Sequence, residues 1–226
     1  MPSEGMFRHP TSVLLCGDNR SLLNWVAYAF ASTENPEFIW TDARLSDQVL
    51  DDDDPLARHM VPQDRLHFLY TNEVLRDDSV LTLGLEGVIR ADEPPSNVRH
   101  LIEFLRLPPR LQEMLSVAQR EGRPATLVLS NGHRMASRFP AETVAPFLQA
   151  VIGAGAILLM TFADAPGEAR QAFETVLLLD GENPKQWRQA TLTAEKGPSD
   201  GPFRTGAKHR LDDLEPVASV LARALK

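Results

Sequence analysis

The sequence predicts a single α/β domain over residues 1–226, with a mostly parallel central sheet and an antiparallel C-terminal extension. Short apolar runs alternate with helical segments as far as residue 162, which is typical of βαβ units. Beyond that point two strand-like segments, 173–179 and 187–194, follow each other across a turn at Glu182-Asn183-Pro184, which indicates antiparallel pairing. A chain of 226 residues that is 43% hydrophobic and 24% charged can bury a core without disulfides.

The first half of the chain begins with a predicted strand at Ser12–Cys16. A short polar turn leads into a helix at Ser21–Ser32, which is apolar on almost all sides and is therefore expected to be buried. Further strands are predicted at Glu37–Thr41 and Leu66–Tyr70. Residues 71–97 contain two glycines and two prolines, and we expect them to form an irregular insertion.

The second half contains two continuous apolar runs, Ala125–Leu129 and Ala156–Phe162, that are typical of central parallel strands buried on both faces. Helices are predicted around them, at 98–106, 110–121, 141–153 and 214–226. Pro108-Pro109 separates the first two of these helices, because proline lacks the backbone donor that a helix interior needs.

The net charge of −8 argues against broad, non-specific binding to nucleic acid, which depends on Lys and Arg neutralising phosphates. One basic patch lies near the end of the chain. We expect it to be a solvated hairpin, with a local nucleic-acid contact as the alternative. Its members are Lys196, Arg204, Lys208, His209 and Arg210. The run of four acids at 51–54 is likewise expected in solvent.

The terminal residues and the single cysteine indicate a cytoplasmic protein. Residues 1–10 lack the apolar core of a signal peptide and are expected to be flexible. The longest apolar stretch, near 151–160, is too short to span a bilayer. Cys16 has no partner for an internal disulfide, and the histidines lack the spacing of a zinc site.

The order of these elements resembles the RecA-like ATPase core, and especially its KaiC-like branch, over residues 10–211. The first strand and its buried helix stand where that family has its phosphate loop, and Ala125–Leu129 stands where the family has its magnesium-associated strand. The segment Glu174–Asp180, followed by Trp187–Lys196 and Gly197-Pro198, resembles the family's paired strands that end in a lysine before a glycine-rich stretch. The resemblance implies a three-layer RecA-like core.

The chemistry of a phosphate loop is absent from the turn at Gly17-Asp18-Asn19-Arg20-Ser21. Such a loop needs several glycines, a lysine that reaches the outer phosphates, and a Ser or Thr that holds magnesium. This turn is shorter, lacks the lysine, and places the negative Asp18 near the phosphate position. Arg20 and Ser21 could contact an anion at the helix N-terminus, or Asp18 or Asn19 could simply cap the helix.

The magnesium-holding acid is also missing. Ser130-Asn131-Gly132 follows the Ala125–Leu129 strand, and neither Ser130 nor Asn131 carries a charge. The lysine of the phosphate loop and the acid that holds magnesium are both missing. The resemblance therefore implies a degenerate member of the family that does not hydrolyse nucleotide, with no metal and no cofactor.

Several polar residues fall at or just after the carboxyl ends of the predicted strands, where ligands bind in open parallel sheets. Together they form the expected rim of a ligand pocket: Cys16, Asp42, Ser130, Asn131, His133, Arg134 and Asp164. Ser130, His133 and Asp164 could imitate a hydrolase triad, but no G-x-S-x-G elbow surrounds Ser130. Cys16, at the end of a buried strand, is expected to be inert packing.

Three functional hypotheses follow. The first is a non-catalytic RecA-like domain that regulates or assembles through protein–protein contacts, including self-association as the resemblance implies. The second is a sensor that binds a nucleotide or another small anion without turnover, using Arg20 and the rim. The third is an enzyme of unrelated chemistry with its site at the strand ends, because a fold does not determine function.

Overall fold

The computed structural model describes residues 6–7, 10–34, 38–42, 66–69, 116, 120, 125–130, 132, 152–153 and 155–225. The expected insertion at 71–97 and the acidic run at 51–54 lie outside these residues. Most of the helices expected between residues 98 and 153 also lie outside them, although Ser116, Arg120, Ile152 and Gly153 are helical.

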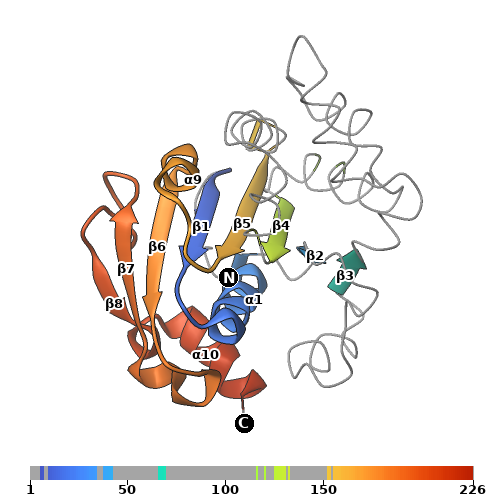
Figure 1. Cartoon of the computed structure of the whole chain (residues 1–226). Coiled ribbons are helices and arrows are strands. Elements are labelled where there is room, and N and C mark those ends of the chain that lie inside the picture. Colours follow the sequence, from blue (N-terminus) through green and yellow to red (C-terminus); the bar gives the residue numbers. More distant parts are fainter. Residues whose placement is uncertain are drawn as a thin grey trace.

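One eight-stranded mixed sheet runs through the molecule in the order β3-β2-β4-β5-β1-β6-β7-β8 (Figure 1). The strands are β1 (Ser12–Cys16), β2 (Phe38–Asp42), β3 (Leu66–Leu69), β4 (Ala125–Ser130), β5 (Ala156–Phe162), β6 (Thr175–Asp180), β7 (Thr191–Lys196) and β8 (Lys208–Arg210). All pairs from β3 to β6 are parallel, whereas β7 is antiparallel to β6 and β8 is antiparallel to β7. The predicted α/β class and the antiparallel C-terminal extension are thus confirmed.

The helices α1 (Arg20–Glu34) and α10 (Glu215–Ala224) pack on each other, and α1 lies against β1, β4 and β5. Residues of β1 alternate between the two faces of the sheet, as in any strand. Val13 and Leu15 join the core under α1, and all five residues of the strand are buried. α1 buries nine side chains because the sheet lies on one side of it and α10 on another, which explains its nearly continuous apolar pattern.

The expected strand at 187–194 is wrong in its first half. Residues Pro184–Gln189 form a 3-10 helix, η1, and β7 begins only at Thr191. The Asn183 side chain accepts hydrogen bonds from the backbone N–H groups of Lys185 and Gln186, at 3.0 and 3.2 Å, so it caps η1. Proline at the first helical position fixes a backbone angle that suits a helical start.

Three short elements near the C-terminus were not predicted. They are α9 (Gly167–Ala172), the strand β8, and the 3-10 helix η2 (Leu211–Asp213). α9 also shortens the expected strand at 173–179: Phe173 is its C-terminal cap, so β6 begins at Thr175. Within the described part of the chain, no helix is both long and apolar enough to cross a membrane.

The N-terminal segment, expected to be flexible, contacts the core through two of its residues. The backbone N–H groups of Met6 and Phe7 donate to Oε1 of Glu34, the last residue of α1, at 2.5 and 3.2 Å. The Phe7 ring lies 5.4 Å from that of Phe203 and 5.8 Å from that of Phe30. Glu34 and two aromatic rings therefore hold residues 6–7 against the domain.

Candidate functional site

The carboxyl ends of the parallel strands meet at one edge of the sheet, as expected of the predicted rim. Asp42 at the end of β2 pairs with Ser130 at the end of β4, and Cys16 at the end of β1 pairs with Phe162 at the end of β5. The register thus brings Cys16, Asp42 and Ser130 to the same edge. Asn131, His133 and Arg134 lie outside the described residues.

The rim residues differ sharply in exposure. Ser130 is fully buried and Cys16 is 2% exposed, whereas Asp164 is exposed and adopts a left-handed backbone conformation with φ 58°. Burial raises the pKa of the Cys16 thiol to about 11, so the thiol stays protonated and is a poor nucleophile. Because Ser130 is fully buried, its hydroxyl is not open to a substrate from solvent, whereas Asp164 is exposed. This difference argues against a hydrolase triad that uses Ser130 as its nucleophile.

In the turn between β1 and α1, Asn19 accepts hydrogen bonds from backbone N–H groups at the start of α1. Oδ1 of Asn19 accepts the backbone N–H of Leu22 at 2.9 Å, and the Asn19 carbonyl accepts the N–H of Leu23 at 2.9 Å. Asn19 is therefore the N-cap of α1, one of the two roles expected for this turn. Its Nδ2 donates to the carbonyl of Glu182, at 2.5 Å, and ties the turn to the segment that follows β6.

Two glycines allow this close approach. A Cβ on Gly17 would lie 2.4 Å from the carbonyl oxygen of Leu179, so the turn rests directly on the backbone of β6. A Cβ on Gly181 would lie 2.6 Å from a methyl carbon of Leu22 and 2.7 Å from Cβ of Ala190. The start of α1 is thus packed against the β6–η1 connection. Asp18, Arg20 and Ser21 remain exposed at its surface.

The lysine singled out by the resemblance has a local structural role. Nζ of Lys196 donates to the carbonyls of Gln171 and Phe173, at 2.9 and 2.5 Å, and so satisfies the C-terminal end of α9. A cation at a helix C-terminus is favourable, because the carbonyls there carry partial negative charge. The Lys196 ammonium therefore forms hydrogen bonds within its own chain, at the end of α9.

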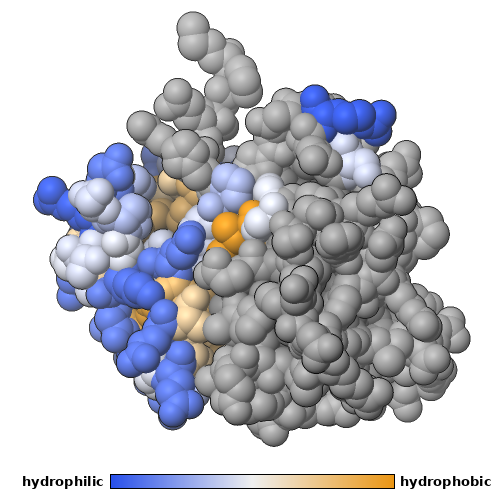
Figure 2. All heavy atoms as spheres, turned by 90° about the horizontal axis from the view of Figure 1, so that it is seen from above, coloured by the Kyte–Doolittle hydropathy of each residue, from blue (hydrophilic) through white to orange (hydrophobic). Residues whose placement is uncertain are grey.

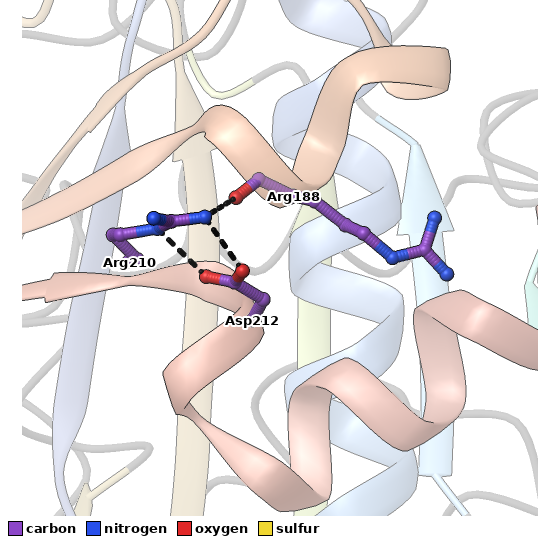
Figure 3. Close-up of polar contacts among 3 residues, drawn as sticks. All are labelled: Arg188, Arg210 and Asp212. Atoms are coloured by element: carbon purple, nitrogen blue, oxygen red, sulfur yellow. Dashed lines mark hydrogen bonds and ion pairs between the residues drawn. The ribbon is translucent and has the colours of Figure 1, made fainter.

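The basic patch lies along β7, β8 and their connection, and its members Lys208 and Arg210 are exposed. The charge of Arg210 is balanced locally: its guanidinium forms two hydrogen bonds with the Asp212 carboxylate, at 3.0 and 2.7 Å, and a third with the carbonyl of Arg188 (Figure 3). The Arg188 guanidinium turns away from this pair and lies 4.7 Å above the Trp187 ring. This arrangement fits the expected solvated hairpin.

Some of the residues that shape this end of the molecule gave no local signal in the sequence. Asn24 in α1 accepts a hydrogen bond from the buried Thr161 hydroxyl at 3.0 Å, and Glu182 supplies the carbonyl that holds Asn19. Both contacts join residues more than 130 positions apart, 137 and 163 respectively. Glu34 had one weak signal, an acid in the last turn of a helix, where the dipole disfavours negative charge.

No group of three or more His, Cys, Asp or Glu side chains among the described residues is arranged to hold a metal ion. No model of a protein family matches the chain, and a search of curated proteins finds no significant relative. The α/β class therefore rests on the sequence pattern and on the structure.

Replacing Asn19 with alanine is expected to destabilise the protein by about 1–2 kcal/mol. The change removes a helix cap and a hydrogen bond to the β6–η1 connection, each contributing on the order of 1 kcal/mol. Urea denaturation followed by circular dichroism measures the loss. Asp18→Ala, at an exposed neighbour, is the matched control and should change stability by less than about 0.5 kcal/mol. Equal losses in both variants would contradict the capping role of Asn19.

Proposed function

We propose that the chain is a non-hydrolysing RecA-like domain that acts as a regulatory or assembly protein through protein–protein contacts. The mostly parallel sheet with antiparallel β7 and β8 supports the likeness to that core, because the resemblance implies the same finish to the sheet. The segment that stands in place of a phosphate loop lies between β1 and α1, at the carboxyl edge of the sheet.

The observation that carries the proposal is the double role of Asn19. In a phosphate loop, free backbone N–H groups at the helix start wrap the anion. Here the N–H of Leu22 is satisfied by Asn19, and the same side chain fastens the turn to Glu182. Gly17 lies against Leu179, so the turn has no room to open into a cradle without separating from β6.

Loss of the cation supports the same conclusion. The outer phosphates of a nucleotide carry several negative charges, and a binding site normally places a lysine and a magnesium ion beside them. The turn at Gly17–Ser21 has no lysine, and the exposed Asp18 adds a negative charge beside Arg20. Lys196, at the end of β7, satisfies carbonyls at the end of α9. Ser130, at the end of β4, is buried and neutral.

Nucleotides are expected to leave the thermal stability unchanged. A nucleotide present at 100 times its Kd would add roughly 2.7 kcal/mol of stability, a clear rise in Tm. Differential scanning fluorimetry with millimolar ATP, ADP and GTP, each with and without magnesium, tests this. ATP turnover that is lost in Arg20→Ala would overturn the proposal, and a shift in Tm without turnover would favour a nucleotide sensor instead.

The assembly part of the proposal has a separate test. Sedimentation equilibrium over a hundredfold range of concentration is expected to show a mass above 25.1 kDa that rises with concentration. A constant monomer mass would rule out self-assembly, irrespective of the nucleotide result.

A further inference from the structure

A pocket of about 640 Å³ lies at the opposite edge of the sheet, where β1 and β6 begin. Its described lining residues come from parts of the chain that are distant in sequence: residues 6–7 and 10–11, residues 174–175, and the β7–β8 connection at 197–203. Its volume is within the usual range for small-molecule sites, about 300–1,000 Å³. Figure 2 looks down on this edge and shows apolar surface between hydrophilic residues.

The described walls of the pocket are apolar, and their only charges are negative. Six of the twelve described lining residues contribute apolar side chains: Met6, Phe7, Pro10, Pro198, Pro202 and Phe203. The charged lining residues are Glu174 and Asp200, both exposed, and no described lining residue is a cation. Lys196, near in sequence, directs its ammonium to the end of α9 and does not line the pocket.

The two carboxylates differ in their partners. Oε2 of Glu174 accepts the Thr11 hydroxyl at 2.7 Å, which orients the carboxylate at the start of β6. Among the described residues, Asp200 has neither a hydrogen bond nor an ion pair from its side chain. Both groups therefore retain acceptor capacity for a ligand, because a carboxylate has about four lone-pair positions.

The loop that carries Asp200 is held in place by its own hydrogen bonds. The Thr205 hydroxyl accepts a hydrogen bond from the N–H of Gly197 at 3.0 Å and donates one to the Gly197 carbonyl at 3.2 Å. The His209 ring bonds the carbonyl of Pro202 at 2.7 Å. A wall that is ordered before the ligand arrives reduces the entropy lost on binding.

We infer that this pocket binds an organic cation: an ammonium or guanidinium group carried on an apolar body. The apolar walls accommodate the body, and Glu174 and Asp200 accept the hydrogen bonds of the cationic head. A free amine or guanidine and a Lys or Arg side chain in an apolar peptide share this chemistry. The inference does not depend on the proposed function, since the pocket lies at the edge remote from the turn at Gly17.

The test uses the full chain and three probes of similar size: 4-phenylbutylamine, its neutral alcohol 4-phenylbutanol, and the anion 4-phenylbutyrate. Titrations followed by ¹H–¹⁵N NMR are expected to show the amine binding most tightly, with shifts at Gly197 and Gly201. Added salt should weaken its binding, because partly exposed charges are screened. Equal affinity for amine and alcohol, tighter binding of the anion, or no binding of the amine would each overturn the inference.

Variants assign the effect to the two carboxylates. Glu174→Gln and Asp200→Asn are each expected to weaken amine binding about 2- to 5-fold, the range for exposed ion pairs, and to leave alcohol binding unchanged. Glutamine can still accept the Thr11 hydroxyl, so the fold is retained. Asp213→Asn, at an exposed acid in η2, is the matched control. Amine binding that is unaltered in the double variant would overturn the inference.

A blocked Phe-Arg dipeptide amide separates the two sources of the cation. Tighter binding of the dipeptide than of the amine supports a Lys or Arg side chain of a partner protein as the ligand. Tighter binding of the amine supports a free small molecule. In either case the affinity must fall in Asp200→Asn for the site to be the one described.

Discussion

Glu34→Gln is expected to stabilise the protein at pH 8 by up to roughly 3 kcal/mol. Burial raises the pKa of the Glu34 carboxyl from 4.5 to about 7, against the lowering effect of the hydrogen bonds from Met6 and Phe7. A pKa difference of this size between the folded and unfolded states corresponds to roughly 3 kcal/mol. Glutamine keeps a carbonyl oxygen for both N–H donors and removes the cost of burying a charge.

The direction of the pH dependence follows from the raised pKa. Between about pH 4.5 and pH 7 the folded protein holds a proton on Glu34 that the unfolded chain has released. The stabilising contribution of Glu34 is therefore complete below pH 4.5 and is lost as the pH rises through 7. Urea denaturation of both proteins from pH 4.5 to pH 8 should show the difference between them growing over this interval.

The control for this measurement is Glu168→Gln, an exposed glutamate in the first turn of α9. Its carboxylate lies near the helix N-terminus, so its removal should cost a few tenths of a kcal/mol and should not follow the same pH trend. A Glu34→Gln variant that is less stable than the wild-type protein at pH 8 would show that the carboxylate is a net stabilising partner of Met6 and Phe7.

The elements that could be predicted from sequence are those whose signal is local. β1 and β5 begin and end at the expected residues, because each is an apolar run bounded by turn residues. The N-cap of α1 was one of two roles expected for the turn, since an asparagine directly before an apolar helix is a recognised start. The antiparallel extension was predicted from two strand-like segments that follow each other across the turn at Glu182-Asn183-Pro184.

The elements that could not be predicted depend on contacts distant in sequence. Lys208–Arg210 has no apolar alternation, and it is a strand only because β7 pairs with it. The strand expected from Trp187 instead begins with a helical turn, because the Asn183 side chain caps η1 and the buried residues Trp187 and Ala190 lie three positions apart. The pocket at the start of β1 and β6 joins three separate segments, so no single stretch of sequence could indicate it.

The second large effect is expected for Gly17→Ala, which should destabilise the protein by about 3 kcal/mol. The new methyl group would lie 2.4 Å from the carbonyl oxygen of Leu179, a backbone atom of β6 that cannot move aside without disturbing the sheet. Overpacking of this kind costs about 1–3 kcal/mol, and contact with backbone leaves little room for relaxation. For a domain of this size the fall in Tm should be about 2–4 °C per kcal/mol.

Gly167→Ala is the matched substitution, because among the described residues no atom beyond its chain neighbours and its own helix backbone lies within 4 Å of the position that its Cβ would occupy. Gly167 begins α9, where alanine is the better helix former, so this variant should be as stable as the wild-type protein or slightly more stable. The comparison also separates two reasons for a glycine at the end of β1. If Gly17 were required for binding an anion, its replacement would lower the affinity for nucleotide and leave the stability of the ligand-free protein unchanged. If Gly17 is required for its close contact with Leu179, its replacement destabilises the ligand-free protein. We expect this second outcome, because the turn packs directly on the backbone of β6.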